Sequence, residues 1–461
     1  MRGDPERMHP GLADLPLVPL PRHAAGAGTL PAFLAEAAVE HGPIFRSLVP
    51  SGREAGREVV FLVGPEANRL VLHTHRQHFS HDLGWTPVLG ASVGQGLLTM
   101  DDPDHAHHRT LWSPAFTSSC MAAYLPAIQR IIVERTRTWA ARAEVDLYAE
   151  ARWLTFDIAA TVLAGLEPGA PLQRARDLFY LLFHGYDRQH ESRQAFQQRK
   201  ARARCDLDDL LLALIAARRS TASAQQPCDV VGLLVRARDA QGGPLTDAQI
   251  LAHLNILLVA GHETTTTFST WALYLLSILP EQRERITAEV ATLAREGDGV
   301  LKPGALQALP ELDRFVREVG RLYTPVLNLP RGVLKPFSFA GYTVPADTSV
   351  RLALAAGHRL PQVFAAPERF DPARFASPRE EDKRRPYALV PFGAGPRTCI
   401  GSQFAQLEIK ALIAQFLRTC VLDPLAGQRP VHAGFWVARI PFGIRVRVTP
   451  ASSSTKPATA A

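Results

Sequence analysis

The segment from residue 251 to residue 279 constrains the fold more than any other part of the sequence. It reads LAHLNILLVAGHETTTTFSTWALYLLSIL and is long and apolar enough to suggest a membrane span. His253, Asn255 and Glu263 interrupt it, however, and such polar groups are costly inside a bilayer. Thr246, followed three residues later by a glutamine, forms a capping box that marks a helix start. We therefore expect a long helix buried inside a globular protein.

The rest of the pattern indicates a mainly α fold with small β-sheets and no internal repeat. The expected helices cover 31–41, most of 104–217, 281–296, 311–322 and 402–418, and the expected strands lie at 44–50, 58–63 and within 330–350. We predict a proline-rich N-terminal segment at 1–25, one domain at 26–450 and a disordered tail at 451–461. The N-terminus lacks the apolar run of a signal peptide or membrane anchor.

Composition and charge narrow the possible partners and compartment. The chain has 461 residues, is 46% hydrophobic and carries a net charge of +7. A dense basic run at 193–204 has no interleaved aromatic residues, so we expect a solvated helix face and no nucleic-acid partner. The five cysteines are scattered without a CxxC pair. We therefore expect neither a disulfide framework nor structural zinc, and we predict a cytoplasmic protein.

The strongest chemical motif is FGAGPRTCIG, which runs from Phe392 to Gly401. Cys399 directly precedes a predicted amphipathic helix, where free N–H groups and the helix dipole stabilise a thiolate. The glycines before it, including Gly393, let the backbone approach a flat ligand. A thiolate is an axial ligand that favours O–O cleavage at haem iron.

A second motif, AGHETT, lies midway along the long helix. Ala260 and Gly261 leave a notch where no large side chain blocks a flat ligand. Glu263 and Thr264 next to that notch could relay protons to bound dioxygen. The alternative is a threonine that bonds back to the carbonyl four residues earlier and bends the helix.

These motifs resemble those of the cytochrome P-450 family, in the family's order and over most of the chain. The resemblance implies the family's fold, an α-helical prism with haem b between the long central helix and the Cys-loop helix. It implies that Cys399 ligates the haem iron, that Phe392 packs beside it and that Arg397 contacts a haem propionate. It makes Glu263 and Thr264 the acid–alcohol pair that activates oxygen.

Weaker motifs gain their meaning from the resemblance. In HAHHR, His105 and Arg109 share one helix face, and the family places such a pair on the propionates, with Arg331 as a weaker further contact. In EVGR, Glu318 and Arg321 correspond to the family's structural ExxR pair. A second arginine completes that set. Arg374 and Arg369 are both candidates, and the spacing of Arg374 to the Cys loop matches better.

The resemblance also implies a function, that of a soluble bacterial-type monooxygenase. Such an enzyme inserts one atom of O₂ into a lipophilic substrate by hydroxylation or epoxidation. The chain shows no flavin or iron–sulfur segment, so electrons would come from a ferredoxin or flavodoxin with an NAD(P)H reductase. We expect Lys383, Arg384, Arg385 and Lys410, near the Cys loop in sequence, to help dock an acidic partner.

The expected substrate pocket is mainly apolar, which favours a fatty acid, terpenoid or steroid. Its candidate residues are Trp85, Val88, Leu89, Val93, Phe179, Phe183, Val259, Leu327 and Leu329. A peroxygenase, an isomerase or a haem sensor would keep Cys399 without needing the Glu263–Thr264 pair. A more remote alternative is a serine hydrolase, because Gly90 to Gly94 matches GxSxG around Ser92.

Overall fold

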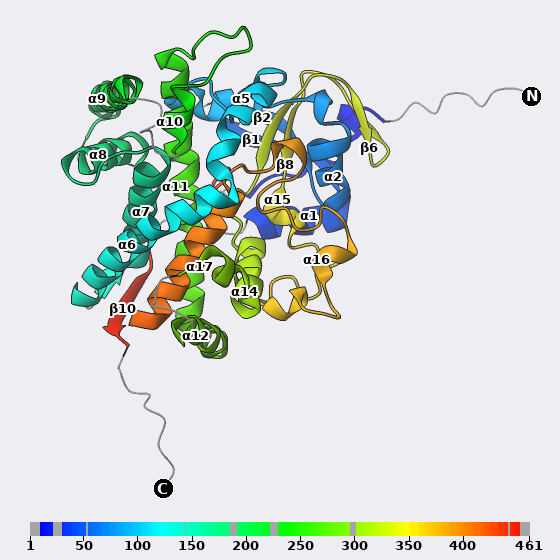
Figure 1. Cartoon of the computed structure of the whole chain (residues 1–461). Helices are drawn as coiled ribbons and strands as arrows, with labels where there is room; N and C mark the ends of the chain where they lie inside the picture. Colours follow the sequence, from blue (N-terminus) through cyan, green and yellow to red (C-terminus); the bar gives the residue numbers. More distant parts are fainter. Residues whose placement is uncertain are drawn as a thin grey trace, which may run out of the picture.

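The computed structural model describes residues 10–21, 30–51, 54–142, 144–184, 191–221, 229–295, 301–440 and 443–451. Much of the predicted N-terminal segment and nearly all of the predicted tail lie outside these ranges. The described residues form a mainly helical body with small sheets, as the sequence predicts. Helices α6 to α9 gather on one side of the molecule, and the largest sheet lies on the other (Figure 1).

The helices vary widely in length, and α11 is the longest. The longer helices are α1 (Leu30–His41), α5 (Asp104–Trp112), α6 (Ser118–Arg142), α7 (Leu147–Ile158), α8 (Ala170–His184), α9 (Arg193–Ser220), α11 (Asp247–Ile278), α12 (Pro280–Arg295), α14 (Pro310–Leu322) and α17 (Ser402–Thr419). The shorter ones are α2 (Pro65–Arg69), α3 (Asp82–Trp85), α4 (Ala91–Val93), α10 (Val230–Leu234), α13 (Pro303–Gln307), α15 (Leu354–Gly357) and α16 (Glu381–Arg384). π-helical turns form η2 (Leu70–Thr74), η4 (Thr86–Gly90) and η6 (Ala159–Leu163), and 3₁₀ turns form η1 (Leu12–Asp14), η3 (Arg76–His78), η5 (Ser113–Phe116), η8 (Pro372–Phe375) and η9 (Gly395–Arg397).

The strands form one five-stranded sheet and two smaller ones. They are β1 (Ile44–Ser51), β2 (Glu54–Leu62), β3 (Phe79–Ser80), β4 (Glu144–Asp146), β5 (Leu329–Val333), β6 (Phe337–Phe339), β7 (Tyr342–Val344), β8 (Ser349–Leu352), β9 (Cys420–Pro424) and β10 (Arg445–Pro450). The large sheet has the order β1-β2-β8-β5-β3, in which β2 and β8 are parallel and the other pairs antiparallel. The short strand β3 pairs with Val333 and Gly332 of β5.

Helix α11 forms the centre of the molecule. It begins at the predicted capping box, where the Thr246 hydroxyl accepts a hydrogen bond from the Gln249 N–H at 3.2 Å. It packs against α7, α9, α14 and α17, which explains why most of its residues are buried (Figure 1). Across residues 10–21, 30–51, 54–142, 144–184, 191–221, 229–295, 301–440 and 443–451, the structure contains no helix that could span a membrane.

A fully buried ion network joins α14 to the segment that leads to the Cys loop. Both oxygens of Glu318 accept hydrogen bonds from Arg321 at 2.8 Å, and Arg374 adds a third at 3.0 Å. These three side chains are 0% exposed. Arg374 also pairs with Glu381 at 2.7 Å. Arg369 is exposed and contributes its carbonyl oxygen, which accepts from both buried guanidinium groups.

The cysteines differ from expectation at one position. Cys205, Cys399 and Cys420 are free thiols, but Cys120 is disulfide-bonded. The sequence predicts no disulfide framework, and it does not anticipate this single bond at Cys120. Scattered spacing could not reveal it, because cysteines far apart in sequence can lie side by side in the fold.

Breaking the buried ion network should lower the free energy of unfolding. We expect Arg374→Met to lower the free energy of unfolding by about 3–5 kcal/mol, because it leaves the Glu318 carboxylate buried without one of its charged partners. Arg369→Met is the matched control, since it removes an exposed guanidinium and keeps the carbonyl. Urea unfolding followed by circular dichroism measures both. Equal midpoints for the two variants would contradict the role given to Arg374.

Candidate functional site

The Cys loop, which runs from Phe392 to Gly401, connects the coil after α16 to α17 and carries Cys399. The loop is closed by a hydrogen bond from the Cys399 N–H to the Phe392 carbonyl oxygen at 2.8 Å. Burial raises the pKa of the thiol, while the Gly401 N–H and the Arg109 charge oppose that rise. Both opposing groups stabilise a thiolate, as expected for a cysteine just before a helix.

Gly395 lets the Cys loop lie against η2. Its φ of 67° is in the left-handed region, and a Cβ there would approach the Leu72 carbonyl oxygen to 2.3 Å. No residue with a side chain fits without movement. Gly393 also has a positive φ of 70°, but a Cβ there would meet only the Arg397 carbonyl oxygen, at 3.9 Å. Gly395 therefore sets how closely the loop packs.

Two residues of the predicted site are exposed, one on α11 and one in the Cys loop. Ala260 is exposed midway along α11, while Leu258 and His262 are buried. Cys399 is also exposed to solvent, yet burial still raises its pKa. The two residues belong to the elements that the sequence predicts on opposite sides of a flat ligand.

Gly261 does not border the predicted notch for a flat ligand. A Cβ on Gly261 would meet Ala159 at 3.6 Å and Leu163 at 4.0 Å, both in η6. The glycine therefore faces the neighbouring helix, and Ala260 is the member of the pair that is exposed.

The Thr264 hydroxyl donates a hydrogen bond to the Ala260 carbonyl oxygen at 2.9 Å. This is the back-bonded state that the sequence left open, and it fixes the position of Oγ1 beside the exposed alanine. Glu263 is 12% exposed, with its carboxylate 3.8 Å from His262 Nε2. His262 is buried among the rings of Phe156 and Phe179.

Basic side chains from separate elements gather near the Cys loop. Burial and the nearby Arg397 charge together lower the pKa of Arg331 to about 9, although the Asp101 carboxylate opposes them. Burial and Arg397 also lower the pKa of His105 to about 4, although Asp102 opposes them. Burial lowers the pKa of Arg109 as well. The predicted residues are thus brought together with too little negative charge between them.

The acidic groups in this cluster only partly balance the arginines. Asp102 Oδ1 lies 3.3 Å from His105 and 3.5 Å from Arg397, and its side chain is 52% exposed. Within the part of the chain that the structure describes, the Arg331 guanidinium donates a hydrogen bond only to the Pro330 carbonyl oxygen, at 2.7 Å. Buried cations that repel one another are costly unless an anion joins them. The two carboxylates of haem b fit this requirement, and the Cys399 thiol fits the predicted role of ligand to its iron.

Sequence reasoning missed one member of this cluster, His81. It is 8% exposed, and Arg331, Arg397 and His105 all lower its pKa, after burial itself. It lies in a segment whose only visible pattern is its glycine content. No local spacing links it to the other residues, so no sequence pattern identifies it.

The predicted substrate residues fall into a partly exposed group and a buried group. Val88, Leu89, Phe183, Val259 and Leu329 are partly exposed and can line a space. Phe179, Val93, Leu327 and Trp85 are buried, and Phe179 packs on Phe183 with ring centroids 4.6 Å apart. Ser92 lies in α4 directly after the π-helical η4, so no strand precedes it as a nucleophile elbow requires.

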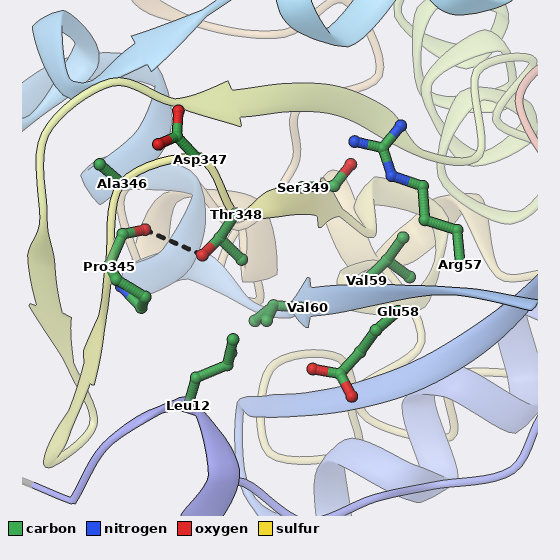
Figure 2. Close-up of a pocket in the computed structure, with 10 residues that line it drawn as sticks. All are labelled: Leu12, Arg57, Glu58, Val59, Val60, Pro345, Ala346, Asp347, Thr348 and Ser349. Carbon is green, nitrogen blue, oxygen red and sulfur yellow. Dashed lines mark hydrogen bonds between the residues drawn. The ribbon is translucent and has the colours of Figure 1, made fainter.

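A separate cavity of about 290 Å³ lies on the large sheet (Figure 2). Residues of β2 and of the turn before β8 line it, together with Leu12. Figure 2 shows the Thr348 hydroxyl bonded to the Pro345 carbonyl oxygen across its rim, at 2.9 Å. None of the site residues predicted from the sequence lines this cavity.

Removing one cation of the basic cluster should change both the stability of the haem-free protein and the rate of haem release. We expect Arg331→Leu to raise the free energy of unfolding of the haem-free protein by about 1–3 kcal/mol, because it removes an unmatched buried cation. The same variant should release haem about tenfold faster, equivalent to about 1.4 kcal/mol. Lys335→Leu, at an exposed position, is the control. A variant that destabilises the haem-free protein and keeps haem normally would contradict this reading.

Comparison with known proteins agrees with the geometry. The family model for cytochrome P-450 matches residues 16–442. Cytochrome P-450 136 of Mycobacterium tuberculosis is 33% identical over 79% of this chain and 74% of its own. Sterol 14alpha-demethylase of Mycolicibacterium vanbaalenii is 28% identical over 79% of this chain and 81% of its own.

Solved structures show the same fold. A structure described as retinoic acid bound cyanobacterial CYP120A1 has a TM-score of 0.79 at 28% identity, and the match covers 95% of this chain and 100% of that one. The family model spans most of the sequence, so the match is not confined to the Cys loop. The chain therefore belongs to the cytochrome P-450 family of haem-dependent monooxygenases.

Proposed function

We propose that this enzyme oxygenates a lipophilic substrate, by hydroxylation or epoxidation, with electrons from a separate redox protein. The observation that carries the proposal is the position of Thr264. Its hydroxyl is fixed beside the exposed Ala260, on the helix that faces the Cys loop in this family. Thiolate-ligated haem supplies the chemistry that activates dioxygen when it is bound.

The protein's own residues would hold the cofactor and supply protons. Cys399 would bind the haem iron, and the Gly401 N–H favours its thiolate form. His105, Arg109, Arg331 and Arg397 would bind the propionates. On the opposite side, Thr264 Oγ1 keeps its lone pairs free to accept a hydrogen bond, because its own hydrogen is donated to the Ala260 carbonyl oxygen. Glu263, at the edge of the protein interior, would pass protons from solvent toward the group that this hydroxyl positions.

The substrate class follows from the partly exposed apolar residues. Val259 is one residue before Ala260, and Leu329 begins β5, the strand that also carries Arg331. Two similar proteins have names that refer to lipophiles, retinoic acid for the cyanobacterial structure and a sterol for the demethylase. We therefore propose a substrate of terpenoid, steroid or fatty-acid type.

The proposed docking surface for an acidic redox partner needs one correction. Lys383, Arg384 and Arg385 are exposed, in agreement with the expectation. Lys410 is buried and pairs with Asp313 at 2.8 Å, because α17 turns it toward α14. Lys410 therefore cannot contribute to docking, and the proposal rests on the three exposed residues.

Thr264→Ala tests the proton supply. We expect product formation to fall by about 10²-fold while NAD(P)H consumption continues, because the hydroxyl that delivers protons is lost. The experiment uses a surrogate ferredoxin and reductase, with lipophiles chosen by the shift they cause in the Soret band. Thr264→Ser, which keeps the hydroxyl, is the control and should retain most activity. If Thr264→Ala forms product as fast as the wild type, a peroxygenase or isomerase becomes the better reading.

Charge reversal at Arg384 tests the docking surface. We expect Arg384→Glu to slow reduction of the haem by an acidic ferredoxin by about tenfold at low salt, with a smaller effect at high salt. Lys335→Glu reverses a similar exposed charge in the turn between β5 and β6 and should leave the rate unchanged. Stopped-flow reduction across a range of ionic strength measures both. Equal rates for the two variants would refute this surface.

A further inference from the structure

We propose that His81 is an additional ligand for a haem propionate, through its Nδ1 atom. It is not part of the HAHHR or FGAGPRTCIG motifs and comes from a different part of the fold. The proposal depends on the haem site of the family and not on the proposed substrate.

The position of His81 results from the close approach of α3 and β5. His81 follows directly after β3, which pairs with Gly332 of β5, and it caps α3. A Cβ on Gly84 of α3 would lie 2.5 Å from the Pro330 carbonyl oxygen, and a Cβ on Gly332 would lie 2.4 Å from the Leu83 Cβ. Only glycines at both positions allow this spacing. The contact brings His81 next to Arg331 on β5.

The ring of His81 is held with one nitrogen available. Its backbone N–H donates to Asp101 Oδ1 at 2.6 Å, and the ring is stacked on His105 with centroids 6.5 Å apart and planes at 18°. The Leu98 backbone forms a hydrogen bond with the ring and raises its pKa. Among the residues that the structure describes, Nδ1 is buried and has no hydrogen-bond partner. A buried polar atom without a partner is costly, so such an atom in a native structure needs an explanation.

The surroundings of that nitrogen favour an anion. Arg331 of β5, Arg397 of η9 and His105 of α5 all act on His81 electrostatically and lower its pKa, after burial. Arg109 and Asp102 flank His105, and Asp101 holds the His81 backbone. A carboxylate placed among these groups would form a hydrogen bond with Nδ1. Its negative charge would offset the positive charges that lower the pKa of the ring. His81 would then bind a proton together with the propionate, so haem binding would take up a proton.

Haem release is the direct test. Holoenzyme is mixed with excess apomyoglobin, and the transfer of haem is followed in the visible spectrum. We expect His81→Gln to release haem about tenfold faster than the wild type, because a charge-assisted hydrogen bond is lost. His73→Gln changes an exposed histidine on η2 and should leave the rate unchanged.

Two further readouts separate propionate binding from a structural role. With haem dimethyl ester, which has no carboxylates, His81→Gln and wild type should release the cofactor at the same rate. With ordinary haem, wild-type release should accelerate from pH 5 to pH 8 as the His81 proton is lost, more steeply than in His81→Gln. The proposal is overturned if His81→Gln accelerates loss of both cofactors equally, or changes neither. It is also overturned if the two pH profiles are parallel, a comparison that remains possible if the ester does not bind.

Discussion

The unmatched positive charge buried beside the Cys loop is the constraint on which the site depends. Arg331, Arg397 and Arg109 come from three separate elements, and burial lowers the pKa of each. A protein core does not tolerate such a cluster without an anion. The fold therefore favours a cofactor that brings negative charge to this cluster. The two propionates of haem supply that charge next to the thiol that would bind its iron.

Two further features keep this arrangement in place. The Glu318–Arg321–Arg374 network is fully buried and ties α14 to the coil that leads to the Cys loop, so the loop has a rigid base. Helix α11 forms the opposite wall, and its threonines bond back along the helix, from Thr264 to Ala260 and from Thr265 to Gly261. The buried network thus anchors the Cys loop, and the back-bond fixes the Thr264 hydroxyl on α11.

The sequence predicted the parts of the structure that local chemistry determines. The capping box at Thr246 located the start of α11, and the glycines and cysteine of the Cys loop indicated its shape. Apart from the pairing of Arg374 with Glu318, which the family resemblance implied, it could not predict contacts between distant segments. His81, the approach of Gly84 to β5, the disulfide at Cys120 and the inward turn of Lys410 all depend on tertiary packing. The π-helical turns likewise have no signal in apolar periodicity.

The visible spectrum of the dithionite-reduced protein with carbon monoxide tests the central claim most directly. Thiolate ligation by Cys399 predicts a strongly red-shifted Soret band that is lost in Cys399→Ala and kept in Cys205→Ala, which removes an exposed cysteine on α9. A protein without haem, a Soret band typical of histidine ligation, or a red-shifted band that survives in Cys399→Ala would contradict the account.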